Sequence, residues 1–172
     1  MILLATLDSA IDAAPKPVAQ MKRNVHIIPL SRDHHHGLLF CWKIRQGINR
    51  NASPERVQSY VDYFWKQHLL QHFHDEEKIL FLDRKNALCQ RAIAEHRQIE
   101  ELVRKLSSSK PDKAQLLRLA DLIHDHIRFE ERELFPWLES ELSIAELAEI
   151  GGKLQESHSA NKGDSFCDEF WI

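Results

Sequence analysis

Two segments of the chain repeat one pattern of residues that could bind metal ions. Residues 72–81 and 126–135 each begin with a histidine, carry two adjacent glutamates about one helical turn later and end in Leu-Phe. In a helix, residues four apart lie on the same face, so the histidine and the first glutamate of each segment would lie side by side. An imidazole and a carboxylate that face the core are costly to bury without a partner. A metal cation pairs with both groups, so the repeat indicates a metal site.

Histidine is unusually frequent, with 11 among 172 residues, and the histidines are internal and regularly spaced. Apart from His26 and the near-terminal His158, they cluster at 34–36, 68–74, 96 and 124–126. His96 shares a predicted apolar face with Ile99, and His126 shares one with Ile123. Each of the four long predicted helices therefore brings at least one histidine towards the core.

The inward histidine of the first helix is ambiguous. His34 aligns with Leu38 and Cys41, whereas His35 aligns with Leu38 and Trp42. We favour His35 and keep His34 as the alternative.

The predicted metal ligands combine four imidazoles with two carboxylates. A lone inward histidine is usually a hydrogen-bonded core residue, but a core with this many polar groups would leave many donors and acceptors to satisfy. The predicted ligands are His35, His72, Glu76, His96, His126 and Glu130. The further candidates are His34, His68 and Glu100.

The ligand types restrict the metal. A ligand set of imidazoles and carboxylates without sulfur suits iron, manganese or zinc rather than copper(I). A structural zinc ion takes only four ligands, so six candidate ligands are too many for one ion. They fit two ions that share the carboxylates, with an oxo, hydroxo or water ligand between the ions. A ferritin-type site would show Glu-x-x-His, but apolar residues stand three before the three inward histidines of the later helices. The sequence thus excludes that type of site at these positions.

Four long amphipathic helices must position these residues. Ser31, Ser53-Pro54 and Ser143 provide helix starts, and short polar connections separate the helices. We predict an all-α fold, an up-down-up-down four-helix bundle with an N-terminal extension and a short extra C-terminal helix. The predicted long helices run from about 32 to 48, 54 to 81, 86 to 106 and 112 to 136. The predicted domains are an extension over 1–29, the bundle over 30–140, and the C-terminal helix and tail over 141–172.

Composition excludes several classes of function. The formal charge of −3 gives no basic stripe for nucleic acid or an anionic membrane surface. No apolar run approaches the roughly 18 residues of a membrane span, and the apolar start of the chain lacks the basic residues of a secretory signal. Three widely separated cysteines argue against a disulfide scaffold. We therefore expect a cytoplasmic protein.

These residues resemble the hemerythrin-like family of HHE cation-binding domains. The resemblance rests on Asp33-His34-His35 early in the first helix, the two repeated segments, the Glu95-His96 pair and the Leu-Phe-Pro ending of the fourth helix. It covers residues 30 to 140. It implies a four-helix bundle with a non-haem di-iron centre that binds dioxygen, nitric oxide or peroxide.

The sequence departs from the oxygen-carrying members in two places. Those proteins have His-x-x-x-His on the third helix, whereas Glu100 follows His96 here, and the fourth-helix carboxylate is a glutamate at +4 rather than an aspartate at +5. Either Glu100 is a ligand, or a fifth imidazole such as His68 completes the site, or one ion has fewer ligands. We favour an exposed Glu100 and a structural His68. The chain has no Cys-x-Cys segment, which argues against a role in the repair of iron–sulfur clusters.

Three functions remain open from the sequence. The first is a cytoplasmic di-iron protein that binds or senses dioxygen, nitric oxide or peroxide. The second is an oxidase or peroxidase that uses the same centre. The third is a metal-storage or metal-sensing module, or a helical interaction domain that has lost its metal.

Overall fold

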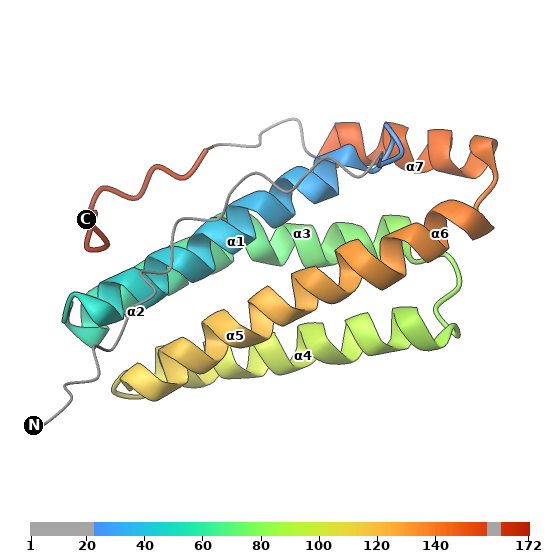
Figure 1. The fold of residues 1–172 in the computed structure, drawn as a ribbon. Coiled ribbons are helices and arrows are strands. Elements are labelled where there is room, and N and C mark those ends of the chain that lie inside the picture. Colours follow the sequence, from blue (N-terminus) through green and yellow to red (C-terminus); the bar gives the residue numbers. More distant parts are fainter. Residues whose placement is uncertain (1–22, 158–162) are drawn as a thin grey trace, which may run out of the picture.

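The chain folds as a bundle of long helices with an additional C-terminal helix. The computed structural model describes residues 23–157 and 163–172, and within these ranges it contains helices but no strand (Figure 1). The elements are α1 (Ile28–Asn49), α2 (Pro54–Phe64), η1 (Trp65–Leu69), α3 (Leu70–Asp75), η2 (Glu76–Leu80), α4 (Ala87–Ser108), α5 (Lys113–Phe129), η3 (Glu130–Leu134), α6 (Phe135–Glu141) and α7 (Ile144–Ser157).

Four long helical rods form the bundle. The second rod runs from α2 through η1 and α3 to η2, and the fourth runs from α5 through η3 to α6. The segments η1, η2 and η3 are single π-helical turns inside these rods. The predicted four-helix bundle with an extra C-terminal helix is therefore confirmed. The predicted domain boundaries stay predictions, and most of the N-terminal extension (1–22) lies outside the described residues.

Local sequence signals explain most helix starts. Ser53 caps α2 by accepting a hydrogen bond from Arg56 N, and Asn86 caps α4 by accepting one from Leu88 N. Ser143 and Glu146 form a reciprocal capping box ahead of α7. The prediction for the first helix is corrected, because α1 begins at Ile28 and contains Pro29 in its first turn. Proline is tolerated there because the first turn needs no backbone N–H.

Two apolar clusters fill the bundle, and a polar layer separates them. One cluster lies towards the α1–α2 connection and contains Leu38, Phe73 and Ile127, among others. The other lies towards α7 and contains Leu30 and Leu80. Along α1, the buried His34 lies midway between Leu30 of one cluster and Leu38 of the other.

The C-terminal tail packs onto the bundle rather than leaving it. Phe170 and Trp171 are buried in the cluster beside the α1–α2 connection, and the Phe170 ring lies against Gly47, where any larger residue would overlap it. Asp164 accepts hydrogen bonds from Lys43 and Tyr60. Among the described residues, no helix combines the length and apolar character that a membrane crossing needs.

Candidate metal centre

Six side chains from the four rods meet in the polar layer between the apolar clusters. They come from α1, α3, η2, α4, α5 and η3, and each is at most 5% exposed. They are His34, His72, Glu76, His96, His126 and Glu130.

The six side chains form two groups that share both carboxylates. His34 and His72 belong to one group, and His96 and His126 belong to the other. Within each group, the candidate ligand atoms of the two imidazoles and the two carboxylates all lie within 4.8 Å of one another. The arrangement therefore offers two adjacent cation positions, each with two imidazoles and access to both carboxylates.

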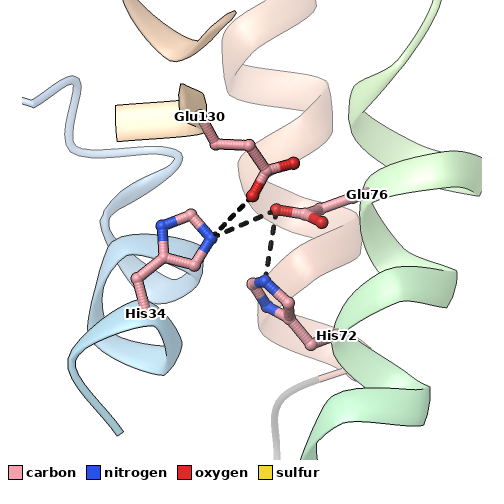
Figure 2. Close-up of side chains that lie close together, drawn as sticks. All are labelled: His34, His72, Glu76 and Glu130. Carbon is pink, nitrogen blue, oxygen red and sulfur yellow. Dashed lines mark ion pairs between the residues drawn. The ribbon is translucent and has the colours of Figure 1, made fainter. Parts of the chain in front are cut away.

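The first group is drawn in Figure 2. His34 Nε2 lies 3.1 Å from Glu130 Oε2 and 3.5 Å from Glu76 Oε1. His72 Nε2 lies 3.2 Å from the same Glu76 oxygen. The two imidazoles thus approach the carboxylate pair with their Nε2 atoms.

The second group lies on the other side of the carboxylates. His96 Nε2 is 3.3 Å from Glu76 Oε2, and His126 Nε2 is 3.3 Å from Glu130 Oε2. The two Nε2 atoms are 3.0 Å apart. All four imidazoles therefore direct the same nitrogen towards the centre.

The first-helix histidine in the centre is His34, so the preference for His35 is corrected. His34 is 2% exposed, whereas the side chain of His35 is exposed to solvent. The face of α1 that packs inward carries Leu38 and Cys41, four and seven residues after His34.

The other two alternatives lie outside the cluster. Glu100 is exposed on α4, as favoured from the sequence, and belongs to neither group of ligand atoms. His68 is half-buried one turn before His72 and belongs to neither group of ligand atoms. Its ring packs 4.6 Å from that of Phe64.

A second set of carboxylates holds the outer nitrogen of every imidazole. The Nδ1 atoms lie 2.7 Å from Glu131 in His34, 3.3 Å from Asp33 in His72, 3.0 Å from Glu77 in His96 and 2.8 Å from Glu95 in His126. With the proton on Nδ1 donated outward, the Nε2 lone pair is free for a cation. Carboxylates in this position orient a ligating imidazole and raise its basicity.

Sequence reasoning assigned no role to these four acids. Each stands next to a residue of the centre: Asp33 precedes His34, Glu95 precedes His96, and Glu77 and Glu131 follow the two shared glutamates. An acid directly beside His34, Glu76, His96 or Glu130 was the signal that could have found them.

The carboxylate oxygens at the centre lack hydrogen-bond partners, and this observation shows whether metal ions would suit the site. Within the described part of the chain, both carboxylate oxygens of Glu76 and of Glu130, as well as His34 Nε2, are buried without a hydrogen bond. Buried polar atoms are rarely left in this state. Two cations between the carboxylates and imidazoles would satisfy them, so the residues fit a dinuclear metal centre.

Charge pairing within the centre shifts the pKa values of its groups. Burial disfavours the charged form of His72, but Glu76 and Asp33 outweigh it and raise the pKa of His72 to about 10. Burial likewise opposes a charged His96, but Glu76 and Glu77 raise its pKa to about 9. Burial also opposes ionisation of Glu76, but the surrounding imidazoles hold its pKa well below the usual value.

The two shared glutamates each open a π-helical turn. Phe81 N donates to Glu76 O at 2.8 Å, and Phe135 N donates in the same way to Glu130 O. Such turns insert one residue into a helix and are frequent at functional sites. The repeated segments therefore match in backbone geometry as well as in residues.

Comparison with known proteins agrees with the geometry. The family model described as the hemerythrin HHE cation binding domain matches residues 27–138, which include all six residues of the centre. No curated protein matches the chain, and no solved structure matches it. The matched region spans well over half of the 172 residues and carries both cation positions. The chain therefore belongs to the hemerythrin HHE cation-binding family.

Proposed function

We propose that the protein is a non-haem di-iron protein that binds or senses a small ligand such as dioxygen, nitric oxide or peroxide. His34 and His72 would hold one iron ion, His96 and His126 would hold the other, and Glu76 and Glu130 would serve both. The observation that carries the proposal is the pair of overlapping ligand groups, which share both carboxylates.

The donor set supports iron. Mixed imidazole and carboxylate ligands suit iron, manganese and zinc, but a single zinc ion would leave part of this set unused. When bound, iron would supply reversible redox chemistry and a coordination position for a small ligand.

The chain's own residues provide the environment. The four outer carboxylates fix the orientation of the imidazoles. The apolar clusters on both sides limit the access of water and larger molecules.

Cys41 and Cys89 are free, and burial raises the pKa of their thiols to about 12 and about 11. Because these thiols stay protonated near neutral pH, they are poor nucleophiles and poor metal ligands. We propose a cytoplasmic location, because free cysteines are typical of a reducing compartment.

Metal analysis coupled to spectroscopy tests this function. After anaerobic loading with ferrous iron and exposure to air, we expect about two iron ions per chain and ligand-to-iron charge-transfer absorption in the near ultraviolet. A colourless protein with less than one metal ion per chain would contradict the proposal. Catalytic turnover of peroxide, lost in His72→Ala, would instead assign the centre to an oxidase or peroxidase.

A further inference from the structure

Arg23 is a buried arginine that precedes the bundle and binds its fourth rod. Its side chain is only 6% exposed, and its guanidinium donates hydrogen bonds to three oxygen atoms of that rod. Nη2 lies 2.6 Å from Glu131 Oε2 and 3.0 Å from Glu131 O, while Nη1 lies 3.1 Å from Glu139 Oε2. Arg23 lies ahead of the family domain, which begins at residue 27. Membership of the family therefore does not account for these contacts.

The sequence of the fourth rod creates one of the acceptors for Arg23. In the π-helical turn η3, Phe135 N donates to Glu130 O, whereas a regular α-helix would direct it to Glu131 O. The next residue, Pro136, has no backbone N–H to donate. Glu131 O thus requires a donor from outside the helix, and Arg23 supplies it. The turn that brings Glu130 into the centre therefore also fixes where Arg23 binds.

Two groups that contact the His34 imidazole are held by Arg23. Glu131 Oε1 lies 2.7 Å from His34 Nδ1, so Arg23 and His34 bind the two oxygen atoms of one carboxylate. The guanidinium also lies over the ring of Phe135, with its carbon 5.3 Å from the ring centre. Phe135 in turn stacks on His34, with ring centres 5.1 Å apart and ring planes 20° apart. Arg23 thus supports the group that bonds the His34 ring and the group that stacks on it.

Arginines also pair with two of the other outer carboxylates, but these two arginines are exposed. Arg84 lies 3.3 Å from Glu77, Arg91 lies 2.8 Å from Glu95, and the arginine side chains are 46% and 50% exposed. Water screens such exposed pairs, which typically contribute about 1 kcal/mol or less. Of the three arginines, Arg23 is therefore the one that burial fixes in place. The other two provide controls of matched chemistry.

We propose that Arg23 is a positioning residue of the metal centre, which fixes Glu131 and, through it, the His34 imidazole. The proposal rests on the proposed function, since it assigns Arg23 a role at one of the two cation positions. Arg23 is not a ligand, because a guanidinium stays protonated and has only donors to offer. One cation position then depends on a segment that precedes the bundle, whereas the position of His96 and His126 does not.

Zinc affinity, measured by competition with a chromophoric chelator, tests this role. For Arg23→Gln we expect binding about tenfold weaker at one of the two positions, at the lower end of the effects of groups behind a ligating imidazole. Arg23→Lys keeps a cation beside Glu131 and should bind zinc with an affinity between those of the wild type and Arg23→Gln. Arg84→Gln and Arg91→Gln should stay within about twofold of the wild type. Equal affinities in Arg23→Gln and Arg91→Gln would overturn the proposal, as would equal losses at both positions.

Coupling between Arg23 and Glu131 separates positioning from a general loss of stability. Glu131→Gln removes the carboxylate through which Arg23 acts, so the addition of Arg23→Gln should weaken zinc binding little further. A second loss of about tenfold in the double variant would overturn the proposal, because effects that add fully indicate independent sites.

Crystal structures of the metal-free variants test the geometry without any metal. In Arg23→Gln we expect the Glu131 carboxylate to turn away from His34 Nδ1, and in Arg91→Gln we expect it to keep that contact. A protein that binds two zinc ions but shows no iron absorption would end the proposed function and leave the role of Arg23 standing. A protein that binds iron as proposed, but keeps Glu131 against His34 in Arg23→Gln, would overturn the role of Arg23 alone.

Discussion

Glu131 and His34 form the shortest link between the inner and outer shells of the centre. A Glu131 carboxylate oxygen lies 2.7 Å from His34 Nδ1, while the preceding residue, Glu130, lies 3.1 Å from Nε2 of the same ring. The pair Glu76-Glu77 holds His96 in the same way, at 3.3 Å from Nε2 and 3.0 Å from Nδ1. Two consecutive glutamates therefore serve opposite nitrogens of one imidazole on a neighbouring helix.

Removing the outer charge on His34 should weaken metal binding without emptying the centre. Glu131 also accepts hydrogen bonds from Arg23 and Ser31, so its orientation is fixed from three sides. For Glu131→Gln we expect a loss of metal affinity of about 10- to 100-fold, as for other carboxylates behind a ligating imidazole. Competition titration with a chromophoric chelator measures it. Glu133→Gln, at an exposed position two residues on, should bind metal like the wild type.

Substitutions of single ligands should separate the two cation positions. His72→Ala and His96→Ala each remove one imidazole from one group only, so each should lower the content of bound metal towards one ion per chain. Glu76→Ala removes a carboxylate common to both groups and should deplete both positions. Metal analysis of the purified variants measures the difference. Equal losses in all three variants would contradict two positions with shared carboxylates.

Helical periodicity in the sequence could not decide whether His34 or His35 faces the centre. Leu38 is four residues after one and three after the other, and both spacings place it on the same helix face. The decision came from packing, because α1 approaches α5 so closely at Gly37 that a larger residue there would overlap Ile127. His34 lies one turn before Gly37 on the same face of α1. We expect His34→Ala to lose bound metal and His35→Ala to retain it, measured by the same metal analysis.

The sequence was sufficient where a local interaction set the structure. Ser53, Asn86 and the Ser143-Glu146 pair each cap a helix through their own side chains, so those starts followed from residue type and spacing. The π-helical turns could not be predicted, because they depend on how the rods pack across the centre. The pairing of each outer carboxylate with an imidazole of another helix was hidden for the same reason: it joins residues such as Asp33 and His72, which are far apart in sequence.

The tail is attached through a largely buried ion pair between Lys43 and Asp164. Lys43 Nζ lies 2.8 Å from Asp164, and the two side chains are 11% and 10% exposed. Asp164→Asn leaves the Lys43 ammonium without its carboxylate, so we expect the free energy of unfolding to fall by about 2 kcal/mol. Urea denaturation measures it. Asp121→Asn breaks the exposed pair with Arg45 and should cost less than about 1 kcal/mol.

The same pair should give the protein an acid-sensitive component of stability. Burial disfavours the ionised form of Asp164, but the hydrogen bonds from Lys43 and Tyr60 outweigh it and lower its pKa below 3.8. Because the folded-state pKa is depressed, the stabilisation is fully present above the unfolded value and is lost as the pH falls through the folded value. In urea denaturation between pH 6 and pH 2, the difference between the wild type and Asp164→Asn should therefore persist to about pH 4 and shrink below it. A difference that stays constant down to pH 2 would show that the Asp164 charge does not stabilise the tail.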